Sequence, residues 1–135
     1  MSQLTYLDVL AWICIDKRKV LCARTIGNDI FYLPGGKRQP GESNWEGIFR
    51  EVKEELNVSL IKETLKECLV VKEKAHGFSA PTWVEMRCFT ADYQGDLTAS
   101  SEIEEIAWFG LKDITHCAPA NQRVLEYLAE QQLID

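Results

Sequence analysis

The sequence predicts an α+β protein in which a mixed β-sheet packs between helices. Most segments are short and rich in β-branched and aromatic residues, one central segment over residues 44–56 has helical spacing, and Pro119 suits the first position of a terminal helix. Many strands with one central and one terminal helix favour a sheet covered by helices. The 135 residues suffice for one core, so we expect a single domain over residues 1–135.

The first part of the chain is predicted to form strands separated by turns. Residues 5–15 have strand composition, end at a charged turn and are expected to pair as a hairpin with residues 20–24. A short strand over residues 31–33 is expected to lead into the turn Pro34-Gly35-Gly36, and residues 37–43 are expected to form a loop.

The segments after the central helix alternate between strands and loops. Their expected order is a strand over 67–76, a strand over 82–93, an acidic loop over 99–104, a strand over 105–109, one helical turn over 111–114 and a helix opened by Pro119. Val124, Leu125 and Leu128 should form the apolar side of that last helix.

Charge and cysteine content limit the possible partners. The net charge is −6, and no block of Lys or Arg indicates binding of a nucleic-acid polymer. The first apolar run lacks a basic start and contains Asp8, so we expect neither a signal peptide nor a membrane span. The five widely spaced Cys residues are expected to be reduced, which favours a cytoplasmic location. No pattern predicts an oligomeric state.

The helix predicted over residues 44–56 has an apolar face and a face of carboxylates. Ser43 is an expected N-cap, with Glu46 as its capping-box partner. Like charges on one helical face are mildly destabilising, so either solvent screens them or a divalent cation such as Mg²⁺ binds them. The apolar residues are Trp45, Ile48, Phe49, Val52 and Leu56, and the residues on the other face are Arg50, Glu51, Glu54 and Glu55.

The spacing from Gly36 to Val58 closely resembles the Nudix box, G-x5-E-x7-R-E-U-x-E-E-x-G-U, in which U is an aliphatic residue. The chain departs from this pattern only at Asn57, where the family has a Gly that ends the helix in a left-handed conformation; Asn tolerates that conformation next best. The resemblance implies a Nudix-type α/β/α sandwich and hydrolysis of a phosphoanhydride bond with Mg²⁺, or with Mn²⁺, as cofactor.

The resemblance also implies roles for the box residues. Glu51, Glu54 and Glu55 would bind the metal ions, and the backbone carbonyl of Gly36 would supply a further oxygen ligand. Arg50 would orient a neighbouring carboxylate in the catalytic site.

The general base is expected to be Glu51 or a carboxylate of a downstream loop. The tract over residues 101–109 resembles the acidic loop that precedes a Trp-containing strand in the family, and its spacing favours Glu105 over Glu102 and Glu104. An ordinary solvated acidic loop is the other interpretation. Glu42 would be an outer or weak metal ligand.

Two residues outside the box are candidate substrate ligands. Residues 118–121 resemble a Pro-Pro-Ala-Asn stretch of MutT-like family members, in which the Asn binds the purine, so Asn121 would read the base; alternatively it bonds only nearby backbone. Arg24 lies where such enzymes bind phosphate or ribose, and is otherwise an exposed Arg at a strand end. Leu33, Phe78 and Trp83 could line a base pocket or be plain core.

These observations predict a nucleotide hydrolase. Residues 72–76 lack both the Pro typical of the ADP-ribose enzymes of the family and the nearby Tyr of its dinucleoside polyphosphate enzymes, and the long motif of the NADH pyrophosphatases is missing. The resemblance therefore implies a nucleoside triphosphate, cut to the monophosphate and pyrophosphate, as the expected small-molecule substrate. Oxidised purine nucleotides such as 8-oxo-dGTP are the expected choice. The alternatives are a pyrimidine dNTP, another nucleoside diphosphate derivative, or a non-catalytic domain that senses a nucleotide or binds a protein.

Overall fold

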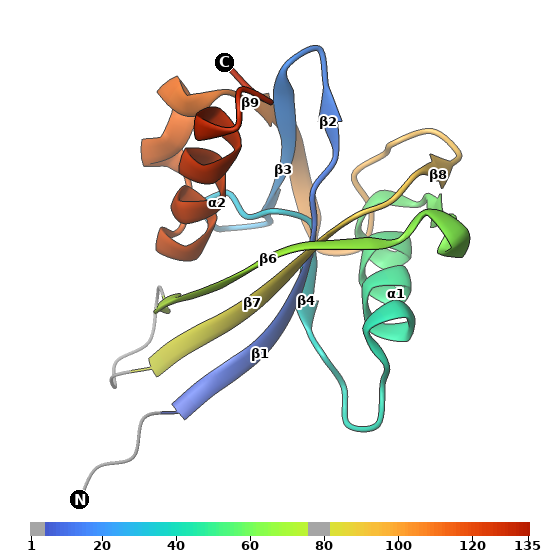
Figure 1. The fold of residues 1–135 in the computed structure, drawn as a ribbon. Helices are drawn as coiled ribbons and strands as arrows, with labels where there is room; N and C mark the ends of the chain where they lie inside the picture. Colours follow the sequence, from blue (N-terminus) through green and yellow to red (C-terminus); the bar gives the residue numbers. More distant parts are fainter. Residues whose placement is uncertain (1–4, 76–81) are drawn as a thin grey trace, which may run out of the picture.

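The structure is a computed structural model that describes residues 5–75 and 82–135. Its elements (Figure 1) are β1 (Thr5–Trp12), β2 (Ile15–Asp16), β3 (Lys19–Thr25), β4 (Gly35–Lys37), α1 (Asn44–Leu56), β5 (Ser59–Leu60), the 3₁₀ helix η1 (Lys62–Thr64), β6 (Lys66–Lys74), β7 (Thr82–Thr90), β8 (Tyr93–Gln94), β9 (Ile103–Phe109), the 3₁₀ helix η2 (Leu111–His116) and α2 (Pro119–Glu130). No helix among the described residues is long and apolar enough to span a membrane.

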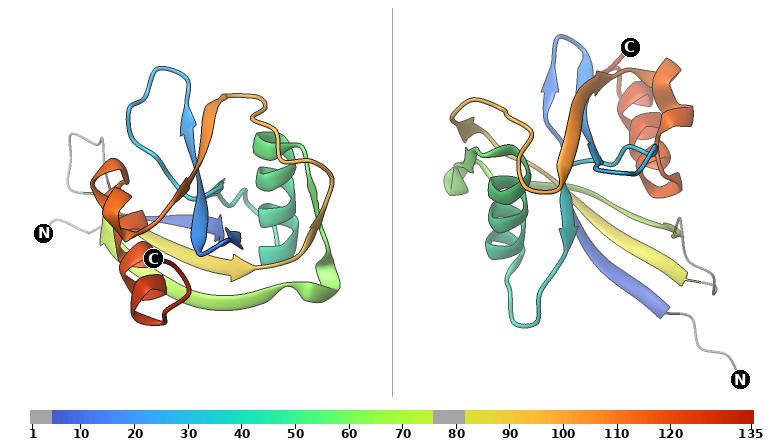
Figure 2. Two further views of the ribbon diagram at one scale, coloured as in Figure 1. Left: turned by 90° about the horizontal axis from the view of Figure 1, so that it is seen from above. Right: turned by 180° about the vertical axis from the view of Figure 1, so that it is seen from behind.

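The strands form a mixed sheet and two smaller antiparallel sheets. The mixed sheet has the order β4-β1-β7-β6, in which β1 runs parallel to β7 and the other neighbours are antiparallel. A second sheet has the order β2-β3-β9, and β5 pairs with β8. The helices α1 and α2 lie on opposite sides of the strands in the views of Figures 1 and 2. This arrangement confirms the predicted α+β sandwich.

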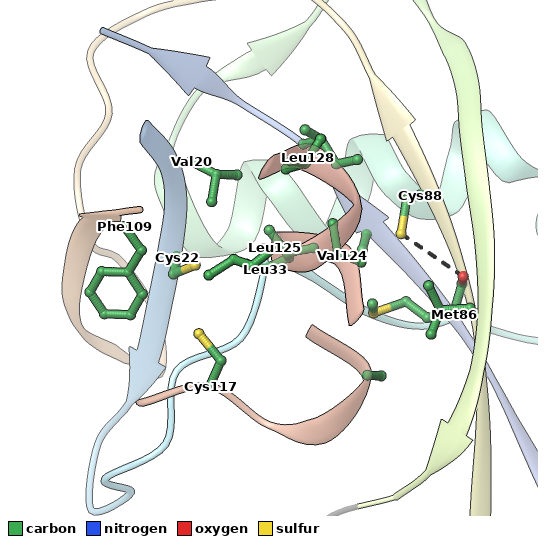
Figure 3. Close-up of a cluster of buried hydrophobic side chains, with 14 of the residues drawn as sticks. Val20, Cys22, Leu33, Met86, Cys88, Phe109, Cys117, Val124, Leu125 and Leu128 are labelled. Atoms are coloured by element: carbon green, nitrogen blue, oxygen red, sulfur yellow. Dashed lines mark hydrogen bonds between the residues drawn. The ribbon is translucent and has the colours of Figure 1, made fainter. Parts of the chain in front are cut away.

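Strand β1 separates two hydrophobic cores because successive side chains of a strand point to opposite faces. Leu10 and Trp12 belong to the core that α1 covers, whereas Ala11 and the following Ile13 belong to the core that α2 covers. Figure 3 shows part of the α2 core, in which Leu125 and neighbouring residues of α2 pack toward β3 and β7.

Both predicted helices are confirmed. The helix α1 has the predicted bounds, the Ser43–Glu46 capping box is present, and Asn57 ends the helix in the left-handed region with φ 57°. The helix α2 begins at Pro119 and buries Val124, Leu125 and Leu128.

Strand pairing differs from prediction in the first part of the chain. Only the short β2 forms the hairpin with β3. The longer β1 is not part of this hairpin and pairs with β4 and β7 instead. In place of the strand expected over residues 31–33, Phe31 and Tyr32 form isolated bridges. The glycines of the expected turn belong to β4, where turn and loop were expected. Strand β9 begins at Ile103 because pairing with β3 extends into the acidic tract.

Candidate active site

The helix α1 presents its carboxylates on one face because its other face is fixed in the core. Ile48, Val52 and Leu56 are fully buried at helical spacing, which sets the rotation of the helix. Glu51 and Glu55 consequently face β4, where two backbone glycines approach the helix.

The two glycines of β4 are required by close contacts. Gly35 has φ +147°, and a Cβ at this position would clash with the Leu10 carbonyl of the neighbouring strand. A Cβ at Gly36 would lie 2.7 Å from the carboxylate of Glu51. The Glu51 carboxylate therefore lies directly against the backbone at Gly36, and any larger residue would displace it.

Glu55 is the most deeply buried of the three carboxylates. Its pKa is raised to about 8, mainly by burial and also by the charges of Glu51, Glu54 and Glu102, against the opposing effect of a hydrogen bond from the Gly35 N–H. That N–H donates to Glu55 Oε1 over 3.1 Å. A buried carboxyl group among other carboxylates gains most from a bound cation, because a cation removes the repulsion that opposes its ionisation.

Arg50 connects Glu51 to the loop before α1. Its guanidinium donates to both oxygens of Glu42 over 2.7 and 2.9 Å and to Glu51 over 2.9 Å, and it lies 3.7 Å from Glu54. The hydrogen bonds from Arg50 lower the pKa of Glu42 to about 2, so this carboxylate stays ionised. Arg50 is thus placed to orient Glu51.

The three downstream carboxylates have different surroundings. Glu102 is close enough to Glu55 to raise the pKa of that group. Glu104 and Glu105 instead form ion pairs with Arg24, at 3.0 and 2.9 Å. The Ser100 N–H donates to the Glu55 carbonyl over 2.9 Å, so the chain just before Glu102 lies against the end of α1, while Arg24 lies in an ion-pair cluster with Glu104 and Glu105.

A pocket of about 260 Å³ extends from the carboxylate site toward the start of α2. Gly36 and Glu55 line it together with Asn121, and most of its other lining is apolar, including Leu33. Asn121 is buried, and its Oδ1 accepts a hydrogen bond of 2.8 Å from the Leu33 N–H. Trp83 does not line the pocket as the structure describes it. Phe78 lies outside the described residues.

Sequence reasoning missed the residues that β1 and β7 contribute to this pocket. Leu7, Val9, Val84 and Met86 line one wall because β1 and β7 are parallel neighbours. Their alternation indicated strands with one apolar face, but no local signal identified which two strands are neighbours.

The donor set fits a hard divalent cation. Carboxylate and carbonyl oxygens are what Mg²⁺ prefers, and the Gly36 backbone together with Glu51, Glu54 and Glu55 offers them on facing elements. Among the described residues, no three acidic, His or Cys side chains converge into a closed cluster. Mg²⁺ does not need one, because it usually keeps several waters and shares its coordination with substrate phosphates.

A carboxylate-bearing helix beside a Gly-Gly strand, at one end of an apolar pocket, is an arrangement that suits a divalent cation and a phosphorylated ligand. The family model of the NUDIX domain matches residues 5–131. The chain therefore belongs to the Nudix hydrolases, a family that acts on phosphoanhydride bonds of nucleotide-like substrates and generally uses divalent metal ions.

Individual relatives agree with this assignment. The chain is 30% identical over 119 residues to the Nudix hydrolase YvcI of Bacillus subtilis, with 84% of this chain and 73% of that protein covered. It is 35% identical over 83 residues to the human 8-oxo-dGDP phosphatase NUDT18, with 58% of this chain and 23% of that protein covered.

Solved structures show the same fold at lower identity. A MutT NUDIX hydrolase from Burkholderia pseudomallei has a TM-score of 0.73 at 22% identity, over 90% of this chain and 97% of that one. A MutT protein from Methanosarcina mazei Go1 has a TM-score of 0.73 at 20% identity, over 98% of this chain and 99% of that one.

Proposed function

We propose that this Nudix hydrolase is a Mg²⁺-dependent pyrophosphohydrolase that cuts a nucleoside triphosphate into the monophosphate and pyrophosphate, with oxidised purine nucleotides such as 8-oxo-dGTP as substrates. The observation that carries the proposal is the pocket between the carboxylates of α1 and Asn121. A nucleotide whose phosphates lie at Glu55 and Gly36 would place its base in the apolar part of this pocket.

The residues of α1 and β4 are assigned roles in this reaction. Glu51, Glu54, Glu55 and the Gly36 carbonyl would hold the Mg²⁺, which on binding would neutralise phosphate charge and lower the pKa of a bound water. Arg50 holds Glu51 in position through hydrogen bonds to both Glu51 and Glu42.

Glu102 is the downstream carboxylate that we assign to the site, as metal ligand or general base. The hydrogen bond from the Ser100 N–H to the Glu55 carbonyl holds the loop that carries Glu102 against α1 and supports this role, whereas Glu105 is paired with Arg24. A matched pair of variants tests the choice. Glu102→Gln should lower kcat roughly 100-fold or more, as expected for loss of a base or metal ligand, while Glu105→Gln should cost clearly less. A larger loss for Glu105→Gln would contradict the assignment.

The hydrogen bond between Asn121 and Leu33 determines what the Asn can read. The Leu33 N–H takes one of the two lone pairs of Oδ1 and thereby fixes the orientation of the amide, whose NH₂ can only donate. A base with carbonyl oxygens, such as 8-oxoguanine, supplies the matching acceptors.

A second candidate substrate is the corresponding nucleoside diphosphate. It is favoured by the human relative, whose name describes an 8-oxo-dGDP phosphatase. The same pocket would take the base, and the scissile bond would again lie at the carboxylates. Product analysis separates the candidates, because the triphosphate yields pyrophosphate and the diphosphate yields inorganic phosphate.

Activity on a nucleotide panel tests the proposal. Purified protein with Mg²⁺ would be incubated with 8-oxo-dGTP, 8-oxo-dGDP, dGTP and pyrimidine dNTPs, and the products would be separated by ion-exchange chromatography. We expect oxidised purine nucleotides to be hydrolysed with the highest kcat/KM. If no nucleotide is hydrolysed faster than by a Glu54→Gln control, the enzymatic proposal fails, and preference for a pyrimidine would overturn the substrate assignment.

Asn121 provides a test of base recognition. Asn121→Asp keeps an oxygen for the Leu33 N–H but replaces the donor with a charged acceptor, so kcat/KM for purines should fall roughly 10- to 100-fold. Asn121→Ala also leaves the Leu33 N–H unpaired and should cost about 1–3 kcal/mol of stability. Equal losses for purine and pyrimidine substrates in Asn121→Asp would contradict base reading.

A further inference from the structure

Arg24 lies beside an irregularity in the sheet formed by β3 and β9. In the antiparallel register, Arg24 is opposite Glu105, but the next residue, Thr25, is opposite Ile103. Glu104 is therefore an extra residue on β9, which is the definition of a β-bulge. Side chains of a strand alternate between the two faces of the sheet, and one extra residue reverses this alternation. The bulge therefore determines which face each residue before it on β9 occupies.

The guanidinium of Arg24 binds both residues of the bulge. Its Nη2 and Nε donate to Glu105 Oε1 over 2.9 and 3.2 Å, and its Nη1 donates to Glu104 Oε1 over 3.0 Å. The same Nη1 donates to the backbone carbonyl of Asn28 over 3.1 Å. In a regular strand, consecutive side chains would point to opposite faces, so one guanidinium could not hold both carboxylates.

The bulge is connected to the active site by backbone hydrogen bonds. Just before it on the chain, the Glu102 carbonyl accepts from the Ile26 N–H over 2.9 Å. Further back, the Ser100 N–H donates to the carbonyl of Glu55 over 2.9 Å. Ile103, between Glu102 and the bulge, is buried and lines the pocket. The bulge therefore lies one residue after the pocket-lining Ile103 and two residues after Glu102, so its position affects both the pocket wall and the placement of Glu102.

We infer that Arg24 is a positioning residue, which clamps the bulge at Glu104 and Glu105 and thereby fixes Glu102 beside Glu55. This inference rests on the proposed function, in which Glu102 belongs to the catalytic site. It replaces the expected role of Arg24 as a substrate ligand. Four of the five guanidinium N–H groups donate to protein groups, which ties the Arg24 side chain to β9 and to the Asn28 carbonyl and leaves a single N–H for any phosphate.

A double-mutant cycle distinguishes a clamp from a substrate ligand. The variants are Arg24→Gln, the pair Glu104→Gln/Glu105→Gln, and the combination of all three. If Arg24 acts through the bulge, removing either side of the clamp should lower kcat roughly tenfold with KM nearly unchanged, and the combination should be no worse. If Arg24 instead binds phosphate, Arg24→Gln should raise KM while the glutamine pair leaves both constants at the wild-type values, which would overturn the inference.

Arg24→Lys supplies the conservative comparison. Lys keeps the charge and binds phosphate well, but it lacks the planar fork that spans two carboxylates. The clamp therefore predicts that Arg24→Lys shows most of the kcat loss of Arg24→Gln. Wild-type kcat and KM in Arg24→Lys would contradict the clamp.

Amide hydrogen exchange tests the clamp without any substrate. The Ile26 N–H bonds the Glu102 carbonyl, so its exchange should become at least tenfold faster in Arg24→Gln and in the glutamine pair, with global stability checked by urea unfolding. Unchanged exchange at Ile26 would overturn the inference. If the wild-type protein hydrolyses no nucleotide, the proposed function fails, while this exchange result still decides whether the clamp exists.

Discussion

Replacing Glu55 by Gln should stabilise the metal-free protein at alkaline pH while abolishing its activity. Folding raises the pKa of Glu55 from 4.5 to about 8, mainly because the group is buried and also because other carboxylates lie nearby. Between these values the folded state binds a proton that the unfolded state has released, so the contribution of Glu55 to stability is lost as pH rises toward 8. The full rise corresponds to at most roughly 5 kcal/mol.

Urea unfolding of the metal-free protein between pH 5 and pH 9 measures this effect. Wild-type protein should lose stability across this range relative to Glu55→Gln, and the two proteins should nearly coincide at pH 5. The Gln side chain keeps an oxygen for the Gly35 N–H, so that hydrogen bond is preserved in the variant. Glu54→Gln is the matched control, because this side chain is 54% exposed and its removal should change stability little.

Two results would refute the reasoning. One is a Glu55→Gln variant that is no more stable than wild type at pH 9, and the other is an equal gain in Glu54→Gln. Added Mg²⁺ provides a second readout: it should restore the stability of the wild-type protein above pH 7 and have little effect on Glu55→Gln, because binding requires the ionised carboxylate.

Two backbone predictions follow from the glycine and Asn geometry around α1. Gly36→Ala places a Cβ 2.7 Å from the Glu51 carboxylate and should lower kcat roughly 10- to 100-fold. The control is Gly41→Ala, whose Cβ would meet no atom within 4 Å, so kcat should stay unchanged. Its φ of +83° should still lower the free energy of unfolding by about 1–2 kcal/mol. Equal kcat in the two variants would refute this account. Asn57→Ala should lower the free energy of unfolding by about 1 kcal/mol, because Ala tolerates the left-handed φ at this helix end poorly. Asn57→Gly should be as stable as the wild-type protein or more stable, and urea unfolding of both variants measures the difference.

The sequence by itself determined the helix that defines the family. Its apolar spacing, its Ser43 cap, the Asn57 that ends it and the carboxylates it presents all lie within one contiguous segment, so local periodicity and capping chemistry suffice to predict them. The start of α2 at Pro119 was predictable for the same reason.

Only the tertiary structure decided which residues complete the site. The pairing of β1 with β7, the hydrogen bond from Leu33 to Asn121 and the contact of Arg24 with β9 join residues far apart in the chain. A strand pattern specifies which face is apolar, but not which strand becomes the neighbour or where a bulge interrupts the register. For that reason the sequence alone could not show that Glu104 and Glu105 pair with Arg24, or that the loop before Glu102 is hydrogen-bonded to the end of α1.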